Sequence, residues 1–334
     1  MYRVIDTVSI DAMSITGYHR GKKPREERDV DGSGMAGEVR EVRLEQGVIR
    51  YREVGTGPTL LFVHGVMANG VLWRDVVAAL SGSFRCIVPD LPLGGHSVPM
   101  CPDADLTPRG VARIVADFME VLDLHDVTLV GNDTGGAICQ VVISEHSERV
   151  GRLVLTDCDA YDAFFPVVIG GLFRHLARFF GTRLVDSLAW LLRARFAQRA
   201  LFKGVAVRRP NDETLDAYYT PLVQNAGVRR DLTKFLRAVS RRYTIEAARS
   251  FPGFEHPVLI AWGRKDLLLS SRLAVRLQRD FPDARLEIID GSRTFVPEDR
   301  PERLAELIRE FQGESTSQLR GASSGPQEGV STGV

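Results

Sequence analysis

Apolar positions along this chain follow two patterns, one alternating and one continuous, and both predict strands. Residues 39–47 and 48–55 alternate apolar and polar side chains, as in an antiparallel hairpin at the edge of a sheet. Near-continuous apolar runs predict parallel strands buried on both faces, at 59–65, 85–90, 127–131, 152–157, 257–263 and 285–290.

Helical segments separate these strands. The clearest helix begins after Thr107, an N-cap residue, with Pro108 at the first helical position. The alternation stops over 160–245, where several helical stretches and no convincing strand are found. We therefore expect one core of the α/β class, formed by 37–159 and 246–312 and interrupted by a helical cap at 160–245.

The two ends differ from this core in composition. Residues 1–36 are polar and aperiodic, and 313–334 are rich in Ser and Gly, so both are expected to be disordered. Met1 and Met35 are both candidate start residues. No signal peptide and no span of about 20 uncharged residues is found, and the four cysteines lack metal-site spacing. These features favour a cytoplasmic protein without a membrane span.

Charge and motifs exclude several function classes. Lys+Arg and Asp+Glu both number 43, whereas a nucleic-acid-binding domain usually has a basic surplus. No dinucleotide fingerprint, phosphate loop or metal-ligand cluster occurs, so no cofactor and no metal are expected. A small-molecule substrate is the expected partner, and the oligomeric state is left open between monomer and homodimer.

The stretch 127–140 contains the strongest chemical signal. Gly131-Asn132-Asp133-Thr134-Gly135 has the spacing of a nucleophile elbow between a strand and a helix, where small residues avoid collisions at a strained turn. The Thr134 N–H at the helix start and the Val66 N–H in the preceding loop are the expected donors to negative charge beside Asp133.

Together with His64-Gly65, residues 90–97 and residues 261–266, this elbow resembles the α/β-hydrolase superfamily from about residue 38 to 312. The resemblance implies an α/β-hydrolase fold: a mostly parallel eight-stranded sheet flanked by helices, with a helical cap. Because Asp replaces Ser at the elbow, haloalkane and fluoroacetate dehalogenases and epoxide hydrolases are the most similar families. A turn residue without a chemical role is the alternative for Asp133.

A carboxylate at the elbow is ionised near neutral pH without help from a base. It can displace halide or open an epoxide, forming an ester on the enzyme, and hydrolysis of that ester then needs a base. In the similar families this base is a histidine after the last strand. Here residues 290–304 match the residues that flank this histidine in the similar families, but Thr294 occupies the position of the histidine.

Three other histidines are candidates for the missing base. His64 and His96 lie in loops at the carboxyl edge of the strands, where ligands bind in open α/β sheets, and His175 lies on a cap helix. His64 is also expected to brace the oxyanion loop. Asp266 occupies the usual position of the catalytic acid, and Asp157 and Asp159 are the alternatives. Two carboxylates near Asp133 would raise one pKa and produce a general acid or base.

The substrate site is expected to include His64, Gly65, Val66, Thr134, Thr294 and Tyr218. Val66 and Thr134 replace the Asn and Trp that hold halide in similar dehalogenases, and Met67 replaces a Pro of epoxide hydrolases. Nearby Asn69 and Trp73 are expected to cap a helix and fill the core. Four tyrosines fall in the cap and are candidates for protonating an epoxide oxygen: Tyr161, Tyr218, Tyr219 and Tyr243.

The cap carries 13 Arg and 2 Lys against 6 acidic residues, on a chain with zero net charge. This surplus indicates either a solvated face or the steering of an anionic substrate, with anionic lipid or a protein partner as further options. Three functions fit the sequence. The chain is a hydrolase with Asp133 as nucleophile, a lyase, isomerase or cyclase with Asp133 as acid or base, or an inactive ligand-binding homologue.

Overall fold

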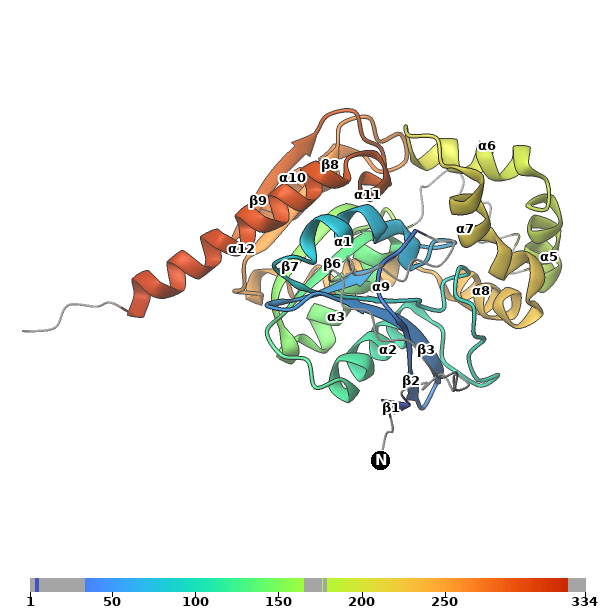
Figure 1. The fold of residues 1–334 in the computed structure, drawn as a ribbon, viewed down its shortest axis with the longest axis horizontal. Coiled ribbons are helices and arrows are strands. Elements are labelled where there is room, and N and C mark those ends of the chain that lie inside the picture. Colours follow the sequence, from blue (N-terminus) through green and yellow to red (C-terminus); the bar gives the residue numbers. More distant parts are fainter. Residues whose placement is uncertain (1–3, 6–33, 165–175, 177–178, 324–334) are drawn as a thin grey trace, which may run out of the picture.

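The computed structural model describes residues 4–5, 34–164, 176 and 179–323, and a single twisted sheet runs through it (Figure 1). The strand order is β1-β2-β3-β5-β4-β6-β7-β8-β9. Strands β1 to β3 and β5 pair antiparallel, and β5, β4, β6, β7, β8 and β9 pair parallel. The strands are β1 (Val4–Ile5), β2 (Val39–Leu44), β3 (Gly47–Val54), β4 (Thr59–Val63), β5 (Arg85–Pro89), β6 (Val127–Asp133), β7 (Val150–Cys158), β8 (Val258–Gly263) and β9 (Ala284–Ile289).

Each strand predicted from an apolar run is present, and the alternating pair forms the β2–β3 hairpin. The eight predicted strands correspond to β2 to β9. A ninth strand, the two-residue β1, pairs with Val42 and Glu41 of β2 although it falls in the segment 1–36 that was expected to be disordered. Residues 6–33 lie outside the described part of the chain.

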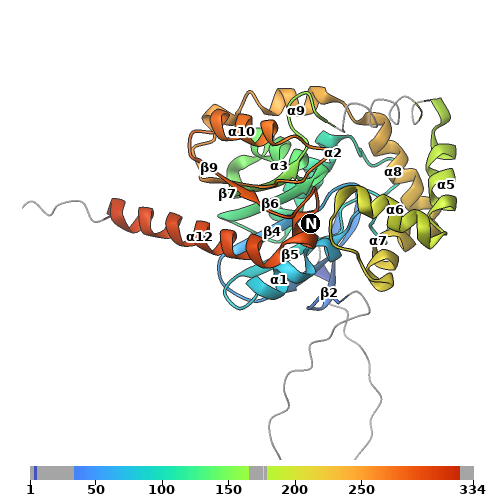
Figure 2. The same cartoon turned by 90° about the horizontal axis from the view of Figure 1, so that it is seen from above.

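Helices cover both faces of the sheet (Figure 2). Helices α1 and α12 pack together on one face, and α2, α3 and α9 pack on the other. As predicted, Thr107 caps α2, because its hydroxyl accepts a 3.1 Å hydrogen bond from the N–H of Gly110. The helices of the core are α1 (Arg74–Leu80), α2 (Pro108–Val121), α3 (Thr134–Glu145), α9 (Arg241–Ala247), α10 (Ser271–Asp280), α11 (Val296–Asp299) and α12 (Pro301–Ser323), with 3-10 turns η1 (Gly70–Trp73), η2 (Ser147–Arg149) and η3 (Phe251–Gly253).

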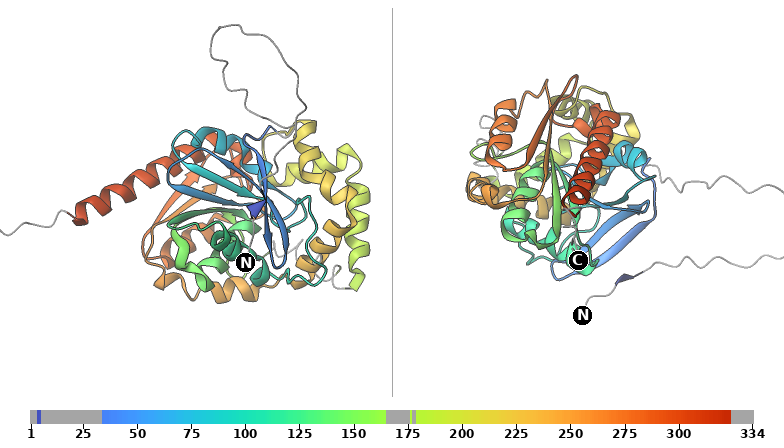
Figure 3. Two further views of the ribbon diagram at one scale, coloured as in Figure 1. Left: turned by 60° about the horizontal axis from the view of Figure 1, so that its bottom comes forward. Right: turned by 90° about the vertical axis from the view of Figure 1, so that its left-hand side faces the viewer.

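In the described part of the chain, four further helices form the cap at one end of the sheet, at the right of Figure 1. They are α5 (Thr182–Leu191), α6 (Arg195–Val205), α7 (Asp212–Gln224) and α8 (Ala226–Ala238). The described part of 160–245 is therefore helical as predicted, apart from a bridge between Ala160 and Ala163. At the other end of the molecule α12 points away from the core (Figure 3) and continues to Ser323, so the predicted disorder from 313 is wrong as far as that residue.

Candidate active site

Asp133 lies at the junction of β6 and α3 with φ 54° and ψ −130°, a strained conformation for a residue with a side chain. Glycines on either side of Asp133 allow this turn without steric overlap. A Cβ at Gly131 would lie 2.7 Å from the Cys139 sulfur, and one at Gly135 would overlap the carbonyl oxygen of Val63. The glycine spacing therefore has the steric purpose that the sequence predicted.

The Asp133 carboxyl group is surrounded by backbone. Burial raises its pKa to about 7, and the nearby charge of Asp266 acts in the same direction. Hydrogen bonds from the backbone N–H groups of Thr134 and Val66 act in the opposite direction by favouring the charged form. Gly65 has no room for a side chain, since a Cβ there would overlap Asp133 Oδ2. The two predicted donors thus both contact this carboxyl group.

Asp133 faces an apolar cavity of about 350 Å³ between the core and the cap. Cap helices contribute Leu188, Leu201 and Leu236, and the core contributes Met67 and Phe295 among others. The polar side chains of the lining are few, as in many small-molecule sites. They are Asp133, Thr134, Asp159, Tyr218 and Tyr219.

Thr294, at the position of the expected histidine, contacts Asp266. Its hydroxyl donates a 3.1 Å hydrogen bond to Asp266 Oδ1, which also accepts from the N–H groups of Leu268 at 2.7 Å and Leu269 at 3.0 Å. The backbone carbonyl of Thr294 accepts a 2.7 Å hydrogen bond from Asn132 in the elbow. The loop after β9 is therefore hydrogen-bonded to the elbow.

Asp157 and Asp266 form a buried carboxyl pair. Asp157 Oδ2 accepts from the N–H of Gly263 at 2.7 Å, while Asp157 Oδ1 and Asp266 Oδ2 receive no hydrogen bond from an amide or a hydroxyl in the described residues. Burial raises the pKa of Asp157 well above its usual range, and the charge and a hydrogen bond of Asp266 raise it further. The raised pKa favours the protonated form of Asp157 beside Asp266.

Asp159, the other predicted alternative, is buried and lines the cavity. Its Oδ2 accepts a 3.1 Å hydrogen bond from the hydroxyl of Thr134. The structure therefore gathers Asp133, Asp159, Asp157 and Asp266 at the carboxyl ends of β6, β7 and β8, as the strand order requires.

His64 has no ring nitrogen left for a substrate. Its Nδ1 lies 2.9 Å from the carbonyl oxygen of Gly65, and its Nε2 accepts a 2.8 Å hydrogen bond from the N–H of Leu91. Burial lowers its pKa to about 4, so the ring is neutral. His64 braces the loop after β4, as expected, and the prediction that it contacts substrate is corrected because it does not line the cavity.

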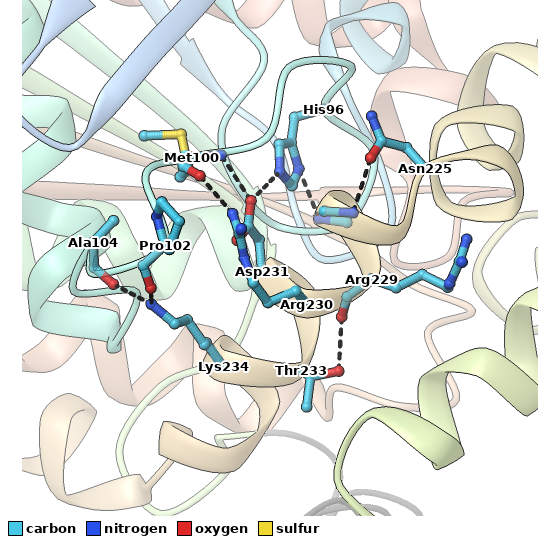
Figure 4. Close-up of polar contacts among 12 residues, drawn as sticks. His96, Met100, Pro102, Ala104, Asn225, Arg229, Arg230, Asp231, Thr233 and Lys234 are labelled. Carbon is cyan, nitrogen blue, oxygen red and sulfur yellow. Dashed lines mark hydrogen bonds and ion pairs between the residues drawn. The ribbon is translucent and has the colours of Figure 1, made fainter.

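His96 joins the core to the cap, and its prediction as a catalytic residue is corrected for that reason. Its Nε2 lies 3.3 Å from Oδ2 of Asp231 on α8, and the same oxygen accepts from the N–H of Met100 at 2.8 Å (Figure 4). Arg230 and Lys234 add contacts from α8 to the loop 100–104. Burial alone would raise the pKa of Asp231, but its hydrogen bonds with His96, Met100 and Arg230 lower the pKa overall.

Tyr218 lines the cavity, but its hydroxyl has a partner. It donates a 2.6 Å hydrogen bond to Glu298, which also forms a two-pronged ion pair with Arg74 at 2.6 and 2.8 Å. The adjacent Tyr219 also lines the cavity, and its hydroxyl has no hydrogen-bond partner in the described part of the chain. The sequence could not choose between them, because it does not show how α7 is rotated about its axis.

The other candidates lie elsewhere. The Tyr161 hydroxyl donates to Asp280 at 3.0 Å, and Tyr243 does not line the cavity. Asn69 caps η1 and Trp73 is fully buried, both as predicted. His175 lies outside the described residues. Among the residues that are described, no acidic, His and Cys side chains gather in a group able to hold a metal ion, and no helix could cross a membrane.

Comparison with known proteins agrees with this geometry. Residues 58–301 match the family model described as the alpha/beta hydrolase fold. Haloalkane dehalogenase 2 of Mycobacterium bovis is 29% identical over 271 residues, which cover 79% of this chain and 91% of that protein. Cis-3-alkyl-4-alkyloxetan-2-one decarboxylase of Xanthomonas campestris is 29% identical over 276 residues, covering 76% and 88%.

A solved structure shares the fold. Haloalkane dehalogenase DbeA from Bradyrhizobium elkani superposes with a TM-score of 0.68 at 19% identity, covering 83% of this chain and 99% of that one. The family match spans most of the chain, which therefore belongs to the α/β-hydrolase family and is related to haloalkane dehalogenases and to a decarboxylase.

Proposed function

We propose that this protein is a hydrolase in which the Asp133 carboxylate attacks a small apolar substrate and forms an ester with it. The observation that supports this most is the placement of Asp133: a strained elbow, two backbone N–H donors and an apolar cavity beside one carboxyl group. These donors hold the carboxyl group in place and favour its ionised form, which is the form that attacks carbon.

Ring opening of an epoxide fits the polar groups of the cavity better than displacement of halide. In that step a bond forms between an Asp133 oxygen and a ring carbon, the carbon–oxygen bond of the ring breaks, and the departing oxygen takes a proton. Tyr219 lines the cavity, and we assign the supply of this proton to its hydroxyl. Val66 and Thr134 stand where similar dehalogenases carry amide and indole donors for halide, and the side chain of Val66 has no N–H.

Release of the ester needs water and a proton acceptor. We assign this step to the Asp157–Asp266 pair, because Asp266 is close enough for its charge to raise the pKa of Asp133, and Thr294 is not a base. A carboxylate is a weaker base than imidazole, by about two pKa units in model compounds. The second step is therefore slow, and the ester accumulates during turnover.

The test is intact-mass measurement after mixing with epoxides, alkyl halides and activated esters. The expected result is an adduct mapped to Asp133 that forms quickly and disappears slowly. In water enriched in heavy oxygen, a single turnover places ordinary oxygen from Asp133 in the product and heavy oxygen in the enzyme. Asp133→Ala serves as the inactive control, since the amide of an Asn variant can hydrolyse back to Asp. Full turnover by the Ala variant would refute the proposal.

A second candidate is a non-hydrolytic reaction in which Asp133 acts as acid or base. Its pKa of about 7 suits proton transfer near neutral pH, and one relative at 29% identity is named as a decarboxylase. Product formation without an adduct, and without solvent oxygen in the product after many turnovers, distinguishes this reaction from hydrolysis. Tight binding of an apolar ligand without any product would indicate an inactive homologue.

A further inference from the structure

Large apolar side chains lie in solvent along α5, α6 and the residues just before α5. Phe179 is 82% exposed, Phe196 71% and Trp190 69%, and Phe180, Leu191 and Leu201 are also exposed. Helices α5 and α6 form the outer side of the cap, away from the sheet (Figure 1). Single exposed apolar residues are ordinary on a protein surface, but six in one segment mark a surface that binds something. We call residues 179–205 the outer cap segment.

The outer cap segment is also basic. It contains five cationic side chains and one acidic side chain, Asp186. Asp186 is paired with Arg229 at 2.7 Å. Arg183, Arg193 and Lys203 are exposed and form no ion pair with another described residue. Aromatic side chains beside unpaired cations are the combination found at the interface between water and an anionic membrane.

The same segment forms part of the cavity wall. Leu188, Ala200, Leu201 and Gly204 line the cavity that holds Asp133, and the last three of these are also exposed to solvent. The cavity therefore reaches the surface at α6, beside the exposed Leu201. An apolar substrate dissolved in lipid would meet this opening if the outer cap segment rested on a bilayer.

We propose that the outer cap segment docks on an anionic lipid bilayer, with Trp190 and Phe196 in the interface and the cavity opening towards the lipid. A second copy of the chain is a poorer occupant. A two-fold dimer through this segment would place the same cationic surface against itself, and like charges across an interface are unfavourable. This proposal concerns binding alone and does not depend on the reaction at Asp133.

The experiment is sedimentation of the full chain with vesicles, either pure phosphatidylcholine or containing roughly 30% phosphatidylglycerol. We expect binding to the anionic vesicles and little to the neutral ones, with binding reduced by added salt. Arg183→Gln and Arg193→Gln should each weaken binding about fivefold, and Trp190→Ser with Phe196→Ser about tenfold or more.

Matched controls come from α10, outside the cap. Val275 is 57% exposed and Arg272 is exposed, so Val275→Ser and Arg272→Gln remove the same kinds of side chain elsewhere. Both control variants should bind like the unaltered chain. Because all these side chains are exposed, thermal unfolding should confirm that every variant is folded.

Two outcomes would overturn the proposal. The first is absence of binding to anionic vesicles, or binding that the outer cap variants and the control variants affect equally. The second is a dimer, seen by light scattering, that the Trp190 and Phe196 changes break while vesicles are not bound. That result would assign the surface to a second copy of the chain.

Discussion

The Thr294 hydroxyl donates a 3.1 Å hydrogen bond to Oδ1 of Asp266, so a threonine meets the carboxylate at the position where a histidine was expected. A hydroxyl can satisfy an acceptor, but it does not take a proton from water near neutral pH. Asp266 consequently has no imidazole partner and lies beside Asp157 instead. The arrangement keeps the loop after β9 in place while removing the usual base.

Replacing Thr294 with His should supply that base. We expect the ester on Asp133 to disappear at least about tenfold faster in Thr294→His, because a positioned base contributes typically 10²–10⁴-fold. Thr294 is fully buried, so the larger ring should also lower stability by about 1–3 kcal/mol. Intact mass against time measures the first effect and thermal unfolding the second.

The control is Thr294→Val, which keeps the size of the side chain and removes the hydroxyl. Thr294→Val should lower the free energy of unfolding by about 1 kcal/mol, because the hydrogen bond to Asp266 is lost, and it should not speed the release of the ester. A folded Thr294→His protein that releases the ester no faster than the unaltered chain would mean that base catalysis does not limit this step.

The buried carboxylate of Asp133 should lower the free energy of unfolding near neutral pH. Its pKa is about 7 in the folded state and near 4 when unfolded, so the native state holds the extra proton between these values. The stability that this proton gives is complete below about pH 4 and is lost as pH rises through about 7. Asp133→Asn should therefore be more stable by about 2 kcal/mol at about pH 8, with a smaller gain at about pH 5.

Urea unfolding at the two pH values measures this difference. Intact mass must first show that the amide has not reverted to Asp. The adduct-forming step should depend on the same ionisation and slow as pH falls below about 7. An equal stability gain at both pH values would contradict the raised pKa of Asp133.

The contact between Asp157 and Asp266 leads to a separate prediction for the stability of an Asp157 variant. Burial and Asp266 raise the pKa of Asp157 in the folded state, so the proton on Asp157 stabilises the fold fully below the unfolded value near 4. That contribution is lost as pH rises through the raised pKa. An amide at this position donates to Asp266 at any pH, and Asp157→Asn should gain about 1–2 kcal/mol at about pH 8.

The same variant tests the role of the pair in ester release. Asp157→Asn leaves Asp133 and its backbone donors unchanged, so adduct formation should continue at its usual rate. Asp266→Asn is the comparison, because it removes the carboxylate that faces Thr294. Unchanged release in both variants would show that the proton of the water goes elsewhere.

Tyr218 and Tyr219 should differ in function although they are neighbours on α7. Tyr219→Phe removes the cavity hydroxyl without a partner, and we expect epoxide turnover to fall about 10²-fold with little change in stability. Tyr218→Phe removes the hydrogen bond to Glu298, which should cost about 1.5–3 kcal/mol because the acceptor is charged. Measuring adduct formation with an epoxide and with an alkyl halide distinguishes the role of Tyr219 from that of Tyr218. Only the epoxide reaction needs the Tyr219 proton, so an equal loss with both substrates would contradict that role.

Several features of this protein could be predicted from local patterns. The apolar runs gave the strands, because a strand buried on both faces excludes polar side chains over its whole length. The glycines at 131 and 135 indicated the elbow, because only a residue without a side chain fits there. The residues that flank Thr294 match the motif of the similar families, and this match showed that the histidine is missing. Each of these signals depends on neighbours a few residues apart.

Relationships between distant residues needed the tertiary structure. Nothing in the sequence joined His96 to Asp231, 135 positions later, and that contact decides that His96 holds the cap rather than acting on substrate. The rotation of α7 decides which tyrosine hydroxyl is left in the cavity.

Asp157 and Asp266 lie at the ends of neighbouring parallel strands, β7 and β8, and only their packing there brings the two carboxyl groups together and raises the pKa of Asp157. The sequence by itself determined the strands, the elbow and the absent base, since these reflect burial and backbone conformation within short segments. The tertiary structure decided which side chains meet, because that depends on how the whole core and cap pack together.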